Sequence, residues 1–463
     1  MDSNLASAAN RFPVYFRAPI LLTLVWILWG VNVWVFQRFS ISYPEILNFD
    51  PTTLLSPKRI ITSGLLMIVG IVVVIVGFTT RFPFSDVLLF PSLLYLTMIF
   101  CLVMPMNYLH RPGRERLLSN LARVVFPAAT GVLFVEVLLG DVLTSISKVI
   151  ADIEVTGCVL AAHMVTPSNG LDGSLNHEVN DMMRNTYSFH EAECADSYMR
   201  PLVTSIPFLL RFRQCWVQYR ATGKAFPNLL NCCKYLSSMP VIWISALTQK
   251  DGHMSRELKA AWIFAVSFNS FFSFMWDIVM DWGLCRQGSK HFLLREQLVF
   301  DTGNSGNEPI LQSKVDEDSL PENEFDAMVR QATVSAIIAV DSKHRQQQST
   351  WFKPHLVYYL AIMLNFVLRI LWSFKLSVHF ELSQEGLTFV LEVCEVFRRF
   401  VWILFRVEWE AVEKGFVVAV PNNGEKDDDS KNSGNVEMLP VDGGEAQLQQ
   451  RKPRTRLDWG PVA

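Results

Sequence analysis

The sequence Val-Cys-Glu-Val-Phe-Arg-Arg-Phe-Val-Trp at residues 393–402 places a glutamate and two adjacent arginines inside an apolar stretch. Apolar sequence runs from Leu387 to Phe405, about the ~20 residues that a helix needs to cross the hydrocarbon core. A charge near the bilayer centre costs roughly 2.5–3.5 kcal/mol, so Arg398 and Arg399 must face protein, water or an anion. Neighbouring residues point about 100° apart on a helix, so the two arginines cannot both extend along one lipid face. We therefore predict a buried anion site in a transporter.

The composition is typical of a polytopic membrane protein. Of the 463 residues, 50% are hydrophobic and 18% charged, and the mean hydropathy is +0.24. Apolar residues are gathered into long blocks rather than spread along the chain. A net charge of −3 argues against nucleic acid as a partner. The sequence has no Gly-x-Ser-x-Gly elbow, Walker loop or His-Glu-x-x-His motif, so we expect no enzyme, cofactor or metal, and a channel or secondary carrier rather than a pump.

The apolar blocks predict an all-α bundle of about ten transmembrane helices. The predicted spans are residues 18–36, 60–78, 87–106, 121–139, 142–164, 201–220, 226–247, 262–279, 355–378 and 387–405. The predicted organisation is a short cytosolic lead (1–17), N-terminal helices (18–139), a second transmembrane domain (140–410) with a polar cytosolic loop (285–350), and a disordered cytosolic tail (411–463). Ten spans would place both termini on one side.

The distribution of Lys and Arg favours the cytosol for that side. Arg220, Lys224, Arg286 and Lys290 lie in loops that would share it with the tail. The basic loop Arg111–Arg116 would then lie on the other side, against the positive-inside tendency.

Charges of both signs accumulate in the predicted spans of the C-terminal half. Asp277 and Asp281, at i and i+4, share one face of a helix and need cations opposite them or a shared proton. The planar fork of Arg suits phosphate, and Lys acts as a point charge. Carboxylates would compete with an anion for these cations and keep the site from binding it too tightly. Candidate cations within apolar blocks are Lys234, Arg369, Arg398 and Arg399.

A structural interpretation stays open for each charge. Asp277 and Asp281 lie between Trp276 and Trp282 and could mark an interfacial aromatic belt at the end of the eighth span. Purely structural roles are equally open elsewhere: snorkelling of Lys234, a helix cap at Asp141, a ligand-free ion pair of Arg398 and Arg399 with Glu395, and plain packing of Trp372.

Five ordered motifs between Leu139 and Glu410 strongly resemble the EXS domain of eukaryotic phosphate exporters. They are Ser205–Trp216 with Pro227–Tyr235, Trp276–Leu284, Phe292–Glu296, Leu368–Trp372 and Glu395–Trp402. The resemblance implies inorganic phosphate as the ligand and residues 140–410 as the EXS domain. It also implies that phosphate contacts Asp141, Lys234, Tyr235, Asp277, Asp281, Arg369, Arg398 and Arg399, with Trp372 and Glu395 near the gate.

The larger members of this family carry an N-terminal SPX domain that senses inositol pyrophosphates. Because only a short lead precedes the first span, the sequence is similar to the SPX-less fungal "ER retention defective" Golgi branch, and we expect that regulation to be absent. The resemblance implies a Golgi membrane protein that moves phosphate from lumen to cytosol and so supports glycosylation and protein retention. The alternative is a sorting receptor or scaffold whose loop and tail bind Golgi retrieval or glycosyltransferase-sorting proteins. Membrane lipid is a further partner, and a homodimer is left open.

The sequence departs from the family pattern at a few positions. Leu364 and Asn365 stand where exporters of the animal type have an acidic pair, and Trp409 replaces a usual polar residue. Cys158 and Cys194 fall where family members can have cysteines, so a lumenal disulfide is a hypothesis.

Overall fold

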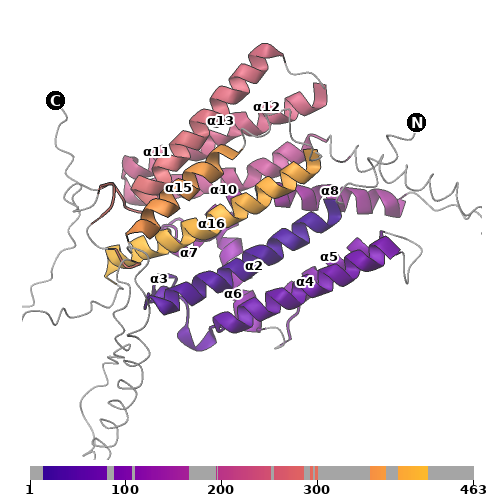
Figure 1. Cartoon of the computed structure of the whole chain (residues 1–463), viewed down its shortest axis with the longest axis horizontal. Helices are drawn as coiled ribbons and strands as arrows, with labels where there is room; N and C mark the ends of the chain where they lie inside the picture. Colours follow the sequence, from indigo (N-terminus) through magenta and orange to yellow (C-terminus); the bar gives the residue numbers. More distant parts are fainter. Residues whose placement is uncertain are drawn as a thin grey trace, which may run out of the picture. The chain divides into compact units, whose positions relative to one another are not determined.

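The computed structural model describes residues 14–80, 88–106, 110–165, 194, 197–251, 255–285, 292–295, 298–300, 355–371 and 384–415. Within these ranges all regular structure is helical, as the sequence predicted (Figure 1). A helix satisfies its own backbone hydrogen bonds, which lipid cannot do, and this favours a helical bundle for so apolar a chain. The predicted loop 301–350 and the chain beyond residue 415 lie outside the described residues.

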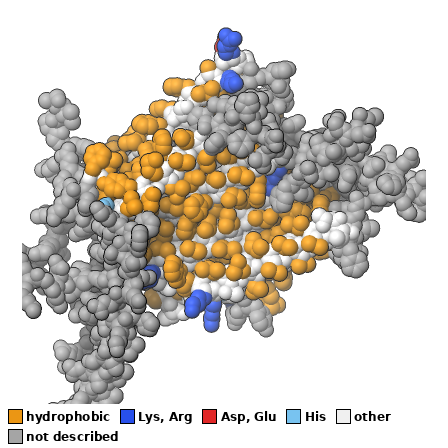
Figure 2. Space-filling model, viewed as in Figure 1, with side chains coloured by type: hydrophobic (Ala, Val, Ile, Leu, Met, Phe, Trp, Pro, Cys, Tyr) orange, Lys and Arg blue, Asp and Glu red, His pale blue; other side chains and the backbone are white. Residues whose placement is uncertain are grey.

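Several helices have the length and composition of membrane spans. In the described part of the chain, three stretches qualify on both counts: α2 (Val14–Arg38), Pro51–Thr80, which contains α4 (Pro57–Thr80), and Arg256–Asp281. The helices α5 (Leu89–Val103) and α15 (Leu356–Ile370) are apolar but shorter. Hydrophobic side chains cover most of the face shown in Figure 2. Such a large apolar surface fits contact with lipid rather than water.

The predicted fourth span, residues 121–139, is wrong. Its first residues end α6 (Arg111–Val125), and α7 (Phe134–Ser145) begins only after a non-helical segment. Pro127 disfavours helical backbone at the residue before it, and Gly131 has a φ of +134°. Helix α8 (Ser147–Val165) follows α7 almost directly. The predicted fourth and fifth spans therefore correspond to a single pass made by α7 and α8.

The next helices lead to a π-helical turn. Helix α10 (Met199–Thr222) matches the predicted sixth span, whereas the predicted seventh consists of α11 (Ala225–Leu236) and α12 (Ser238–Asp251). Helix α13 (Arg256–Trp276) continues into the π-helix η2 (Asp277–Asp281). There the Trp282 amide donates to the Asp277 carbonyl, five residues back, at 2.9 Å. Such turns are rare and are frequent at functional sites.

Helix α16 (Gln384–Lys414) carries the motif at 393–402 through the middle of the bundle. Its 31 residues span about 46 Å at ~1.5 Å per residue. It packs against α2, α7, α15, η2 and the short helix α3 (Tyr43–Ile46). Its fully buried Trp402 shares a core with Trp282 and Tyr358. The helix extends to Lys414, so the first residues of the predicted tail are helical.

Helices α2 and α16 run parallel to each other. Ala18, near the start of α2, shares a core cluster with Val396, and Phe36, near its end, shares one with Phe405. Figure 1 shows the two helices side by side. The described chain therefore begins and ends at opposite ends of the bundle. The predicted position of the two termini on one side concerns residues outside the described ranges and stays a prediction.

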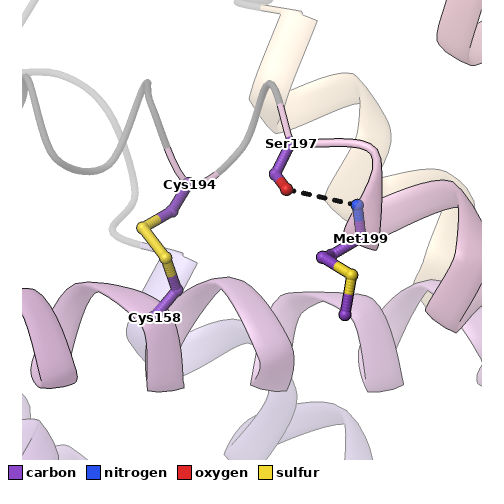
Figure 3. The surroundings of a disulfide bond; sticks show 4 residues. All are labelled: Cys158, Cys194, Ser197 and Met199. Atoms are coloured by element: carbon purple, nitrogen blue, oxygen red, sulfur yellow. Dashed lines mark hydrogen bonds between the residues drawn. A yellow bond between two sulfur atoms is a disulfide. The ribbon is translucent and has the colours of Figure 1, made fainter.

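A disulfide marks one end of the bundle. Cys158 of α8 is bonded to Cys194, which confirms the predicted pairing (Figure 3). Val14, the first residue of α2, lies in the same core cluster as Cys194. We call this the disulfide end.

Basic residues gather at the opposite end, which we call the basic end. Arg213 of α10 donates to the carbonyl of Val125, the last residue of α6, at 2.7 Å. The arginines of α6 therefore lie at the same end as Arg220, in the last turn of α10. The sequence predicted that Arg111–Arg116 and Arg220 lie on opposite sides of the membrane. In the fold they lie at the same end.

Candidate functional site

Asp277, the first residue of the π-helix η2, accepts hydrogen bonds from two arginines. Its Oδ2 accepts from Nη2 of Arg369 at 2.5 Å and from Nη1 of Arg398 at 3.3 Å. Asn365 of α15 lies between them: its Nδ2 donates to the same oxygen at 3.2 Å, and its Oδ1 accepts from Arg398 at 3.4 Å. The neutral amide of Asn365 thus connects an acid and a base of this site.

Asp141 of α7 forms a second buried pair. Its Oδ1 accepts from Nε of Arg211 at 3.0 Å and from the Tyr235 hydroxyl at 2.6 Å. Asp141 lies inside α7 and caps no helix end, so the capping role is wrong. Sequence reasoning did not include Arg211 among the site residues. The signal that could have identified this pair was the presence of an arginine on α10 and an acid on α7, each within an apolar stretch.

Asp281, at the end of the π turn, faces a different set of partners. Its Oδ2 lies 4.0 Å from Nζ of Lys234 and accepts from Nε1 of Trp402 at 3.2 Å. Lys234 is buried, with its ammonium over the rings of Tyr235 and Trp276. It therefore does not snorkel. Trp276 is also buried, as is Trp282, so these tryptophans form no interfacial belt.

Arg399 and Lys234 connect the three acids into one cluster. The Nε of Arg399 donates to Ser145 Oγ at 2.7 Å, and its guanidinium stacks 4.4 Å from the ring centroid of Trp402. Both cations lie within electrostatic range of Asp141 and of Asp277. The acids and bases selected from the sequence on α7, α11, η2, α15 and α16 are therefore brought together.

The predicted gate residues have different outcomes. Glu395 binds Arg398 through both carboxylate oxygens, at 2.5 and 2.9 Å, and is about one-third exposed. This is the ion pair that the structural interpretation expected, but Arg398 also reaches Asp277, so the pair is not isolated. Trp372 lies outside the described residues.

In the described residues the cluster holds five cations and four carboxylates, beside a neutral Arg406–Glu410 pair whose guanidinium lies 4.0 Å from Asp281. The cations are Arg211, Lys234, Arg369, Arg398 and Arg399, and the carboxylates are Asp141, Asp277, Asp281 and Glu395. Buried charges are tolerated only when they are paired and hydrogen-bonded, and here the balance leaves one positive charge. An incoming oxyanion would exchange with carboxylate oxygens on the guanidinium groups rather than meet bare cations. Such exchange makes binding reversible.

A second buried network fixes the segment after the π turn. Glu408 of α16 pairs with Arg295 at 2.8 Å and accepts from the Val299 amide at 2.8 Å and from the Tyr358 hydroxyl. Arg295 also donates to the carbonyl of Trp282. Sequence reasoning missed Glu408, because it lies in the polar last turns of α16. These contacts tie η2 to α15 and α16 and so hold Asp277 and Asp281 in place.

The fold and the charge cluster define a polytopic helical membrane protein with a buried, net-cationic site. Its sequence matches the EXS family over residues 12–412. The chain therefore belongs to the EXS family.

Curated relatives align over most of this chain. It is similar to SPX and EXS domain-containing protein 1 of Dictyostelium discoideum, with 25% identity over 87% of this chain and 37% of the relative. It is also similar to human solute carrier family 53 member 1, at 26% over 85% and 49%, and to the Xenopus laevis xenotropic and polytropic retrovirus receptor 1 homolog, at 26% over the same shares. The chain thus spans half or less of the length of these relatives.

Proposed function

We propose that this protein carries inorganic phosphate across a membrane through the cluster formed by Asp141, Lys234, Asp277, Arg398 and Arg399. The observation that carries the proposal is the convergence of five cations from α10, α11, α15 and α16 on Asp141, Asp277 and Asp281, of which the first two are buried. Ionisable groups within membrane helices are costly and mark substrate pathways. The name of the human relative, a solute carrier, is in keeping with transport.

The chemistry of the cluster favours phosphate. Guanidinium groups donate parallel hydrogen bonds to a tetrahedral oxyanion, and four of the five cations are arginines. The aspartates can accept hydrogen bonds from the hydroxyls of a protonated phosphate, which fully deprotonated sulfate lacks. The site therefore selects phosphate over sulfate by its acceptors as well as by its charge.

The two ends of the bundle support an orientation of the protein in the membrane. Disulfides persist in oxidising compartments, so the disulfide end faces the lumen of the secretory pathway or the exterior. The basic end then faces the cytosol, in agreement with the positive-inside tendency. Together with the resemblance to the Golgi branch, this supports transport from the Golgi lumen to the cytosol, in aid of glycosylation and protein retention. The scaffold function rests on the loop 301–350 and the tail, outside the described residues.

The test is phosphate efflux from liposomes that contain the purified protein, with sulfate as competitor. We expect Arg398→Lys to reduce flux strongly, because Lys keeps the charge but cannot bridge Glu395 and Asp277, and Arg399→Ala to abolish it. Arg111→Ala is the matched control, since Arg111 forms only an exposed pair with Glu115 at the basic end. Full flux in Arg399→Ala, or equal inhibition by sulfate, would refute the assignment.

A tail truncation separates transport from scaffolding. A chain ending before Pro421 keeps every described residue, so a transporter retains its phosphate flux in liposomes. Loss of Golgi enzyme retention in cells, with flux intact, would favour the scaffold.

A further inference from the structure

A second group of buried charges lies at the disulfide end, apart from the phosphate site. Asp152 of α8 is 0% exposed and Glu392 of α16 is 4% exposed. The Nη2 of Arg200, at the start of α10, lies 3.3 Å from Oδ1 of Asp152. The proposed function uses none of these residues.

The position of this pair follows from the packing of α16 against α7 and α8. Arg399 of α16 donates to Ser145 of α7. Glu392 lies seven residues before Arg399, and Asp152 lies seven residues after Ser145. Seven residues are about two helical turns, so Glu392 lies on the same face of α16 as Arg399 and ~10.5 Å nearer the disulfide end. Glu392 therefore lies between Arg399 and the disulfide end along α16.

Glu392 lacks the hydrogen bonds that a buried anion needs. Neither of its carboxylate oxygens has a hydrogen-bond partner in the described part of the chain, and Oδ2 of Asp152 has none either. An ionised carboxyl without such bonds is costly to bury, and two carboxylates in one buried place resist joint ionisation. A single proton on the pair removes both costs.

Charged and titratable groups face the pair from every helix packed around it. Lys148, Asp152 and Glu154 come from α8, Arg17 from α2 and Arg200 from α10. Tyr95 of α5 lies near Asp152. Arg200 already pairs with Asp152. The carboxyl group of Glu392 is therefore the group of this pair whose protonation changes most easily.

We propose that Glu392, assisted by Asp152, is a buried proton-binding site that exchanges its proton with the compartment at the disulfide end, and that this proton controls the passage of phosphate to Arg399. The proton comes from water in that compartment, forms an O–H bond on Glu392 and returns to the same water. No bond to phosphate is made or broken. The proton site stands alone, whereas its control of passage rests on the proposed function.

The control is electrostatic. With Glu392 ionised, the three carboxylates of Asp152, Glu154 and Glu392 balance the positive charge of Arg17, Lys148 and Arg200, and the group does not attract an approaching phosphate. With Glu392 neutral, the three cations face two carboxylates and the group attracts phosphate. Acidification at the disulfide end therefore raises flux, by at most about tenfold per pH unit for one proton.

Infrared spectroscopy tests the proton site without any transport. The wild-type protein in mildly acidic buffer is expected to show the carbonyl stretch of a protonated carboxylic acid, shifted by D₂O, and Glu392→Gln is expected to lose that intensity. Glu413→Gln, an exposed position on the same helix, is the control and keeps it. An unchanged band in Glu392→Gln would overturn the proposal.

Phosphate flux tests the control step. Liposomes are compared with mildly acidic and neutral buffer at the disulfide end, and the ratio of the two fluxes is measured. Glu392→Gln should carry high flux with a ratio set by phosphate ionisation alone, while Glu413→Gln should match the wild type. A wild-type ratio in Glu392→Gln refutes the control step. No wild-type flux at all would refute the proposed function and leave the infrared result intact.

Discussion

At Gly283, directly after the π turn, both backbone and packing require glycine. Its φ is +60°, and an added Cβ would lie 2.4 Å from the ring of Trp409. Gly223 has a similar φ of +68°, but nothing lies within 4 Å of its Cβ position. A tryptophan at position 409 therefore requires the glycine that packs against its ring.

This pair of glycines gives a matched prediction. Gly223→Ala is expected to lower the free energy of unfolding by about 1 kcal/mol, from backbone strain alone. Gly283→Ala adds a clash with a rigid ring and is expected to cost clearly more. Thermal unfolding in detergent measures both. Equal losses would show that Trp409 does not restrict this position.

Arg211 offers a second prediction at the residue scale. Replacement of one partner of a buried ion pair leaves the other charge uncompensated, so Arg211→Met is expected to destabilise the protein by about 3–5 kcal/mol. Adding Asp141→Asn removes the stranded charge and should recover part of that loss. The unfolding midpoints of the single and double variants measure this. A double variant less stable than Arg211→Met would contradict the pairing.

At the scale of the element, the network around Glu408 joins α15, α16 and the segment after η2. Tyr358→Phe removes one donor from a fully buried carboxylate and is expected to cost about 1–3 kcal/mol. Tyr359→Phe, one residue along, removes an exposed hydroxyl that donates to the Phe292 carbonyl and should cost less. Thermal unfolding compares the two. The reverse order would show that Glu408 does not depend on Tyr358.

Sequence reasoning found the charges of α15 and α16 because isolated charges stand out in long apolar blocks. It missed Arg211 because α10 also carries the exposed Arg213, and an amphipathic pattern does not show which of two arginines is buried. The limits of α6 and α7 were missed for a related reason. Hydropathy treats Phe126 and Pro127 as apolar, whereas the backbone responds to the proline and to Gly131.

For the whole molecule, the two ends of the bundle predict which cysteines can be reached from each side. In sealed vesicles, a membrane-impermeant thiol reagent should label Cys285, exposed near the basic end, only from the cytosolic side. After reduction, Cys158, the less buried partner of the disulfide, should react only from the other side. Peptide mapping of the labelled protein locates both. Labelling of Cys285 and Cys158 from the same side would overturn the orientation.

The parallel course of α2 and α16 also constrains how the chain is threaded. A polypeptide whose first and last described helices point the same way passes through the bilayer an odd number of times between them. Within the described residues, the predicted fourth span is lost because α6 stays at the basic end and α7 continues into α8. A reporter fused before Val14 and another fused after Lys414 would accordingly occupy different compartments.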